Sequence, residues 1–413
     1  MNPPLEQSGS MAPCRYFALF LLVLATGCGI ITTGPGKGSG SGPGNSNPAG
    51  NNATYVYVSA SPAQNTYQIS GFSVSANGAL TPISGSPFST SGYGPLSMAA
   101  NGSLLFGADG YSIDTFSIGS SGALSETSSF KAGHLSSANP EPTGGPIDLF
   151  FDTAGSTLYD GFANLDGTEN NGYQALNITS SGGVSVIGSE GSGPALGGVL
   201  AFSGNDQFAY TSSCYHGIPA ISGFARGSNG SLTGLVGQGF PAMPVAPSGD
   251  TYCPTGAATD TSNHLILSVG TAPPDGMQPT GPWQLATYSI DGSGQVSTAS
   301  TSSTMPTTDV GQPAWYQLSH DNKYLAIGGQ SGLQVFAYDA NTGAISDLGN
   351  SSVLTGDNIA QLAWDSNDHL YALAAQANSL YVYSVGSSGA TAASGSPYSV
   401  QGAYALTVTP GQS

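Results

Sequence analysis

Residues 72–80 read Phe-Ser-Val-Ser-Ala-Asn-Gly-Ala-Leu, which is an apolar run, a Gly-containing turn and a second apolar stretch. The same pattern returns six more times, at intervals of 44 to 64 residues, with starts at Phe116, Leu176, Phe224, Tyr288, Phe336 and Tyr383. Two short runs around a glycine turn are typical of antiparallel strands joined by a tight turn. A repeat of this period indicates an array of similar structural units.

A second strand–turn–strand pattern alternates with the first. Its six complete copies begin at Pro95, Pro146, Gly198, Ala257, Pro313 and Ile359. The C-terminus holds only its first half, from Ala403, and the missing second half stands at the other end of the chain, from Thr54. Four strands per repeat are typical of a β-propeller blade.

The sequence therefore predicts an all-β fold, a seven-bladed β-propeller with four-stranded antiparallel blades over residues 54–410. We name the strands of a blade A to D, from the innermost to the outermost. The N-terminal segment supplies strands B, C and D of one blade, and the C-terminal segment supplies its strand A. This arrangement closes the ring and leaves no open sheet edge between the ends of the chain.

Charge narrows the range of partners. The 413 residues carry a net charge of −18 and only five Lys and Arg residues. Nucleic-acid and phosphate ligands are recognised by clustered basic side chains. The composition therefore excludes nucleic acid as an expected partner and disfavours phosphorylated substrates.

The N-terminus has the features of an export signal. Arg15 precedes an apolar run over residues 16–25, and Thr26-Gly27-Cys28 follows it. This order is typical of a secretory signal. The alternative is a transmembrane helix, which needs about 20 apolar residues, whereas glycines interrupt this run from Gly27 onward.

A Cys directly after small residues resembles the lipobox of bacterial lipoproteins, although Ala25 stands where that pattern prefers Leu. The resemblance implies a signal peptide over residues 1–27, a lipid on Cys28 and, over 28–53, a lipidated Cys and flexible tether rich in Gly, Ser, Pro and Asn. The expected partner of Cys28 is membrane lipid. The expected location is the cell envelope, on the outer membrane or facing the periplasm if the cell is Gram-negative.

Replacing Cys28 by Ala is expected to release the protein from the membrane fraction, because the variant has no thiol to carry the lipid. Fractionation of cells that express each form measures this directly. A Cys28→Ala variant that stays membrane-bound without lipid would contradict the lipobox interpretation.

Two other cysteines form an expected disulfide. Cys14 belongs to the removed segment and Cys28 carries the lipid, so Cys214 and Cys253 are left. The fold places them in loops of adjacent blades on one face of the ring, and an exported protein meets an oxidising compartment. Closing 39 residues stabilises the fold by about 3–4 kcal/mol on the chain-entropy model.

Short motifs extend the fold prediction to a family. Tyr55-Val-Tyr-Val, the turn from Gly78 to Pro82 and Ser86-Pro-Phe88, which returns as Ser396-Pro-Tyr398, resemble the YVTN-repeat, lactonase-like seven-bladed propellers with the 6-phosphogluconolactonase-like fold. Members that act on lactones place His, Arg and Glu near the central channel. The matching stretches here are Gly144–Pro146, Gly193–Leu196 and Ser212-Ser213, and none of them holds these residues.

No catalytic residue is therefore assigned. His264, His320 and His369 are expected to be exposed in A–B turns, and His134 and His216 to lie in long loops. No His/Cys metal spacing is present. Residues 164–170 cluster oxygen ligands that suit either a calcium site near Asp166 or a polar turn, and because they lack the full twelve-residue loop pattern we expect no cofactor.

The expected working face is the one that carries the B–C and D–A loops, because long loops on a rigid scaffold concentrate recognition residues. The long loops are 131–145, 160–173, 212–219, 240–253 and 270–283. Their candidate ligand-face residues are Asp160, Asp166, Glu169, Tyr215, His216, Asp250, Tyr252, Asp275 and Trp283. Aromatic side chains beside carboxylates suit a neutral polar ligand or a protein surface, and variable decoration is the alternative.

The leading hypothesis is a membrane-tethered binding or scaffold protein of unknown ligand. The alternatives are a lactonase-type hydrolase, which the unmatched His, Arg and Glu positions disfavour, and a structural envelope protein. If Tyr252 and Trp283 bind ligand, replacing either by Ala should abolish binding and leave melting nearly unchanged.

Overall fold

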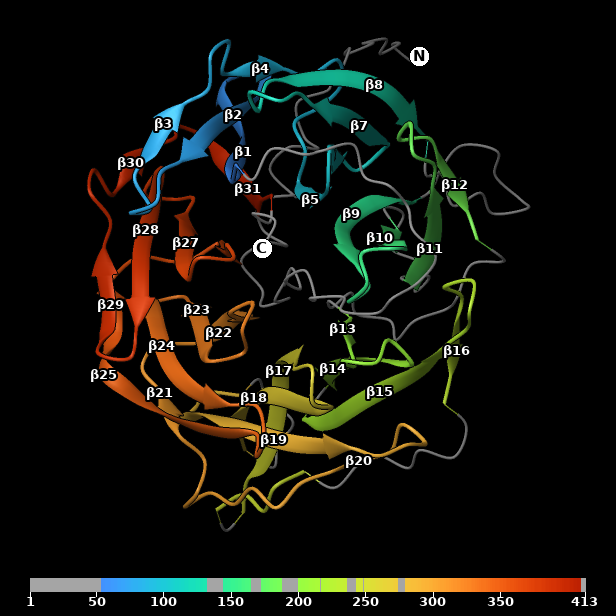
Figure 1. Ribbon diagram of the computed structural model, residues 1–413. Helices are drawn as coiled ribbons and strands as arrows, with labels where there is room; N and C mark the ends of the chain where they lie inside the picture. The colour runs from blue at the N-terminus through green and yellow to red at the C-terminus, as the bar shows by residue number, and fades with distance from the viewer. Residues whose placement is uncertain are drawn as a thin grey trace, which may run out of the picture.

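The computed structural model describes residues 53–131, 144–164, 172–187, 200–215, 217–235, 243–247, 249–273 and 279–409. All regular secondary structure in these ranges is β-strand, and these ranges contain no helix that could span a bilayer. The strands form seven antiparallel sheets arranged around a central axis (Figure 1). The predicted seven-bladed β-propeller is confirmed.

Blade 1 joins the two ends of the chain. Its strands run in the order β31 (Ala403–Val408), β1 (Tyr55–Ala63), β2 (Thr66–Val74) and β3 (Leu80–Pro82), from the inside outward. Val56 pairs with Val408 and Val58 with Leu406. Beyond the strand, the Tyr55 N–H donates a hydrogen bond of 2.8 Å to Thr409 Oγ1. The predicted closure by N-terminal strands B, C and D and a C-terminal strand A is therefore correct.

The other blades follow in chain order, each from strand A to strand D. Blades 2 to 4 are β5 (Ser97–Asn101), β6 (Leu104–Ala108), β7 (Ile113–Ile118) and β8 (Leu124–Phe130); β9 (Gly144–Phe151), β10 (Leu158–Asn164), β11 (Gly172–Ile178) and β12 (Val184–Val186); β13 (Ala201–Phe202), β14 (Phe208–Tyr215), β15 (Ile218–Arg226) and β16 (Leu232–Gly234).

Blades 5 to 7 are β17 (Thr251–Thr259), β18 (His264–Ala272), β19 (Trp283–Ile290) and β20 (Val296–Ser297); β22 (Pro313–Leu318), β23 (Tyr324–Gly329), β24 (Gly332–Asp339) and β25 (Ala344–Thr355); β26 (Gln361–Trp364), β27 (His369–Ala374), β28 (Ser379–Gly386) and β29 (Gly389–Ala392). In blades 1, 5 and 7 a further short strand pairs with strand C, namely β4 (Phe88–Ser89), β21 (Thr307–Thr308) and β30 (Tyr398–Ser399).

A repeated hydrogen bond links several blades to the next one and explains why the repeat needs its glycine turn. The hydroxyls of Tyr57 and Tyr210, both fully buried on strand B, donate to the Gly122 and Gly294 carbonyls in the C–D turn of the following blade, at 2.7 and 2.9 Å. Both glycines have a φ of +82°, a backbone conformation that residues with side chains rarely adopt. Thr115 on strand C makes the same bond to Gly182, at 3.0 Å. The aromatic residue of one repeat and the turn of the next therefore specify each other.

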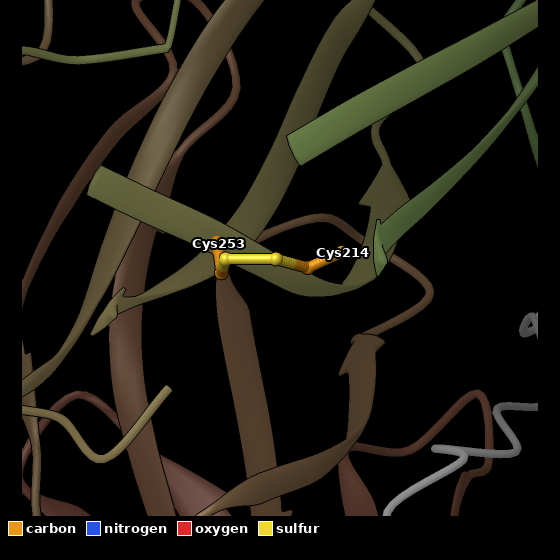
Figure 2. Close-up of a disulfide and its surroundings, with 2 residues drawn as sticks. All are labelled: Cys214 and Cys253. Atoms are coloured by element: carbon orange, nitrogen blue, oxygen red, sulfur yellow. A yellow bond between two sulfur atoms is a disulfide. The ribbon is translucent and has the colours of Figure 1, made fainter. Parts of the chain in front are cut away.

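The Cys214–Cys253 disulfide is present, as expected (Figure 2). Its two Cα atoms lie 5.3 Å apart. Cys214 lies near the end of β14 in blade 4, and Cys253 lies in β17, the inner strand of blade 5. Both cysteines are strand residues rather than loop residues, so the bond links two adjacent sheets directly.

Candidate functional site

Three of the nine candidate ligand-face residues are buried, which corrects their expected place in exposed loops. Asp160 is in the middle of β10 and is 0% exposed. Tyr252 is in β17, is 1% exposed, and its hydroxyl donates to Gln284 Oε1 at 2.6 Å. Trp283 begins β19, is 7% exposed and pairs with Gly270 of β18. The strands extend further into the predicted loops than the turn signals indicated.

Of the remaining six candidates, two lie within the described residues and four lie outside them. Asp250 is exposed just before β17. Tyr215 ends β14. Four candidates lie outside the described residues: Asp166, Glu169, His216 and Asp275. The segment expected to form either a calcium site or a polar turn near Asp166 lies outside them as well. Over the ranges given above, no group of His, Cys, Asp or Glu side chains is arranged to hold a metal ion.

Two buried carboxyl groups of blade 3 have uncommon electrostatics. Asp148 on β9 is 5% exposed, and burial raises its pKa to about 7. Burial also raises the pKa of Asp160 well above its ordinary value, and the charge of Asp148 adds to that rise. Oδ1 of Asp148 and both carboxylate oxygens of Asp160 accept no hydrogen bond from a described residue. Asp148 can therefore take up or release a proton near neutral pH.

The histidines expected to be exposed are mostly enclosed. His369 is 3% exposed, and its Nδ1 lies 2.8 Å from Asp365 Oδ2, to which the Tyr371 hydroxyl also donates. His264 is half-buried and lies 2.7 Å from Asp260 Oδ2 in the same way. In each case the carboxylate stands four residues before the histidine and fixes the A–B turn. The prediction of exposed histidines was wrong for His369, and His264 and His320 are half-buried. The sequence does not show that the next blade packs against these turns, as Gly78 does against His369.

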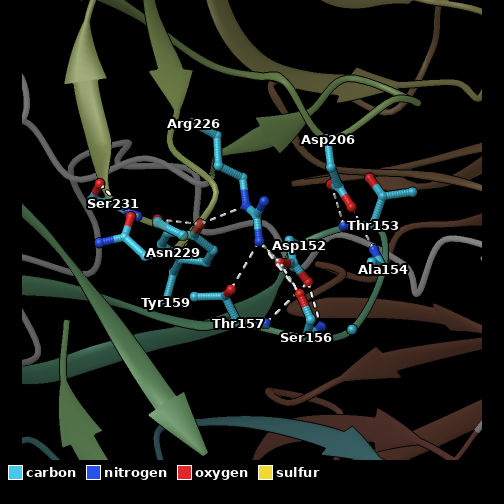
Figure 3. A network of polar contacts seen from close by, with 12 residues as sticks. Asp152, Thr153, Ala154, Ser156, Thr157, Tyr159, Asp206, Arg226, Asn229 and Ser231 are labelled. Atoms are coloured by element: carbon cyan, nitrogen blue, oxygen red, sulfur yellow. Dashed lines mark hydrogen bonds and ion pairs between the residues drawn. The ribbon is translucent and has the colours of Figure 1, made fainter. Parts of the chain in front are cut away.

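Arg226 and Asp152 form a polar network between blades 3 and 4 (Figure 3). The guanidinium pairs with the Asp152 carboxylate and donates to the Tyr159 hydroxyl at 3.1 Å and to Thr157 Oγ1 at 2.9 Å. The Asp152 side chain is 0% exposed and that of Arg226 is 13% exposed. All these groups are engaged with one another, so the network stabilises the interface and offers no open site.

The B–C and D–A face carries a different cluster at blades 1 and 2, a tyrosine ladder made of Tyr404, Tyr67, Tyr93 and Tyr111. The rings of Tyr67 and Tyr93 meet edge to face at 5.5 Å, and those of Tyr93 and Tyr111 lie 5.2 Å apart. Gly94 lies against the rings of both Tyr67 and Tyr404. Tyr93, Tyr111 and Tyr404 are 51%, 56% and 40% exposed. Large aromatic side chains left in water together mark an interaction site more often than isolated ones do.

A groove of about 510 Å³ lies beside the ladder. Its lining combines tyrosine rings with small polar side chains: Asn65, Thr66, Tyr67, Ser89, Thr90, Ser91, Gly92 and Tyr93. The β1–β2 turn and the start of β2 position its first three residues, and β4 and the connection from β4 to β5 position the others. Aromatic surfaces with a few hydrogen-bonding groups are the usual makeup of a small-molecule site. The groove suits a ligand with one apolar face and several hydroxyl groups.

Acidic side chains support the groove from blade 2. Glu126 on β8 accepts a hydrogen bond of 3.0 Å from the Ser91 N–H and a second bond from the Ser91 hydroxyl. Asp109 accepts bonds from the backbone of Tyr111 and Ser112, at 2.8 and 2.6 Å, and so shapes the turn that carries Tyr111. The carboxylates thus hold two members of the site in position.

The tyrosine ladder lies on the face that the sequence argument selected, but in blades 1 and 2 rather than in blades 3 to 5. The ladder joins Tyr67 and Tyr404, at the starts of β2 and β31, to Tyr93 and Tyr111, and the connections beside these four residues are short. Loop length, which directed attention to blades 3 to 5, therefore carried no information about it. The available signal was the four tyrosines themselves, each of which stands close to a predicted turn.

Comparisons with solved structures agree with this fold. The chain is similar to a protein of Bacteroides fragilis assigned by its name to the 6-phosphogluconolactonases, at 16% identity and a TM-score of 0.60, over 88% of this chain and 99% of the other. It is also similar to a periplasmic gluconolactonase of Pseudomonas aeruginosa, at 13% identity and a TM-score of 0.62, over 87% and 99%. No protein-family model and no curated protein matches the sequence. The protein thus has the seven-bladed propeller fold of these lactonase-like structures, and at this identity the likeness extends to the fold alone.

Proposed function

We propose that the protein is an exported, lipid-tethered binding propeller whose tyrosine ladder holds a hydroxyl-rich ligand of the carbohydrate class. The carrying observation is that the ladder exposes three tyrosines, Tyr93, Tyr111 and Tyr404, and that Tyr93 also lines a groove with hydroxyl and amide groups. A sugar ring has an apolar face that stacks on an aromatic ring and an edge of hydroxyls that bonds to Ser, Thr and Asn. Tyrosine itself combines an apolar ring with a polar tip.

The tether is the second part of the proposal. An apolar export signal, Cys28 after small residues and a Gly/Ser/Pro/Asn segment up to residue 53 support it. A flexible segment of this length spans on the order of 25–30 Å. The propeller would then face the periplasm or the cell exterior, where polysaccharides are the abundant hydroxyl-rich molecules.

Hydrolysis of a lactone is the other candidate function, and Asp148 is the observation that favours it. A carboxyl group with a pKa of about 7 on an inner strand has the proton affinity of a general base at neutral pH. The similar gluconolactonase-type structures share the fold. Nothing on the described part of the inner strands supplies the His, Arg and Glu set of the lactone-cleaving relatives, so binding is the better supported function.

Replacing Tyr93 by Ala is expected to weaken carbohydrate binding at least tenfold, which is about 1.4 kcal/mol. Tyr93 touches both neighbouring rings of the ladder, so its loss removes the centre of the platform. Titration calorimetry of the full chain in detergent, with cello- and chito-oligosaccharides and with sugar lactones, measures this effect. Tyr111→Ala should act in the same direction.

Ile218→Ala is the matched control, because Ile218 is 59% exposed at the start of β15 in blade 4. It should leave binding and melting unchanged. If Tyr93→Ala binds every oligosaccharide as well as the parent chain does, the ladder is not the site. Lactone turnover that persists in Tyr93→Ala would instead support the hydrolase.

A further inference from the structure

Behind the tyrosine groove lies a buried carboxylate, one oxygen of which accepts no hydrogen bond. Asp114 on β7 is 1% exposed, and its Oδ2 accepts no hydrogen bond, although Oδ1 accepts one of 3.1 Å from the Ser112 hydroxyl. The Ser129 hydroxyl, opposite Asp114 on β8, lies near enough to oppose the rise in its pKa but forms no hydrogen bond to Oδ2. A buried acceptor without a hydrogen-bond partner destabilises the fold. A donor or cation brought near it is therefore bound favourably.

Gly92 places this carboxylate at the groove. Gly92 is a lining residue, and a methyl group built on its Cα would lie 3.0 Å from Asp109 Oδ2 and 3.5 Å from Asp114 Oδ2. The two carboxylates therefore lie directly against Gly92. Glu126 adds a third acidic group, which contacts Ser91 one residue earlier in the same loop.

The charges of these three groups are not compensated locally. Among the residues that the structure describes, none of Asp109, Asp114 and Glu126 forms an ion pair, and Lys131, which follows β8, pairs with none of them. Burial raises the pKa of Asp114, and the charges of Asp109 and Glu126 add to this rise. The local potential therefore favours a cation and opposes a carboxylate-bearing ligand.

Tyrosine faces act in the same direction, because the negative face of an aromatic ring attracts an ammonium group. We propose that the ladder groove binds a carbohydrate that carries free amino groups, with Asp114 as its main counter-charge. The inference rests on the proposed carbohydrate site and adds the ligand's charge to it. Asp114 is then the residue that determines specificity, and the ladder supplies the contact area.

Two oligosaccharides that differ only in charge test the proposal. Glucosamine hexasaccharide and its N-acetylated form have the same backbone and linkages, and the first is cationic at mildly acidic pH. The parent chain is expected to bind the amino form at least tenfold more tightly at low salt, and added salt should reduce this preference. Asp114→Asn should remove the preference, because it weakens binding of the amino form more than binding of the acetylated form. Glu126→Gln should reduce it in part.

Asp250→Asn controls for net charge, since it removes one exposed carboxylate from blade 5 and should leave the preference intact. Equal affinity of the two oligosaccharides, or a preference that survives Asp114→Asn, would overturn the inference while a Tyr93-dependent affinity still supported the carbohydrate site. If neither oligosaccharide depends on Tyr93, the proposed function itself fails.

Discussion

Replacing Arg226 by Met is expected to lower the free energy of unfolding by about 3–5 kcal/mol, because removing one partner of a buried ion pair leaves an uncompensated charge. The Asp152 carboxylate has no exposed surface, and Arg226 is its only partner of opposite charge in the described structure. The Ser156 N–H and hydroxyl, at 2.6 and 2.8 Å, would still donate to it. Chemical denaturation followed by tryptophan fluorescence measures the change.

A double-mutant cycle with Asp152→Asn separates the ion pair from the packing of the Arg226 stem. The double variant should be more stable than Arg226→Met alone, because its buried amide carries no charge. Lys323→Met is the control, since it breaks the exposed pair with Asp321 and should change stability little. Equal effects of Arg226→Met and Lys323→Met would mean that the blade 3–4 network does not stabilise the ring.

The propeller was predictable because its signal is repeated. Each strand alone is short and carries little information. Seven copies of the glycine-turn pattern that alternate with seven strand pairs fit few folds other than a propeller. The buried hydroxyls of Tyr57 and Tyr210 show the physical basis, because each needs an acceptor and finds one in the glycine turn of the next blade. The split copy at the chain ends predicted the closure for the same reason.

The tyrosine ladder was not predictable in this way, because it depends on which residues the closed ring brings together. Tyr404 and Tyr67 are far apart in sequence and become neighbours only when β31 enters blade 1. Whether a residue near a predicted loop is buried also depends on how the strands pair in the closed ring. Tyr252 and Asp160 follow turn-like sequences, and only the sheet register shows that they belong to strands.

Trp283→Ala is expected to lower the free energy of unfolding by about 3–5 kcal/mol, the usual cost of deleting a buried aromatic ring. Its ring covers Gly270 on β18, where a methyl group would lie 2.5 Å from the ring carbons. Glycine there and tryptophan opposite thus fill one space, and alanine at position 283 would leave a cavity. This result is the opposite of what an exposed ligand-binding tryptophan would give.

The matched variant is Trp283→Phe, which keeps a ring over Gly270 and should cost clearly less than Trp283→Ala. Carbohydrate affinity is measured at a temperature where both variants are folded. It should equal that of the parent chain, because the ladder lies in blades 1 and 2 and Trp283 lies in blade 5. A Trp283→Ala chain that melts like the parent but no longer binds would return the working site to blade 5. The pair of measurements therefore decides between a structural tryptophan and a recognition tryptophan without knowledge of the natural ligand.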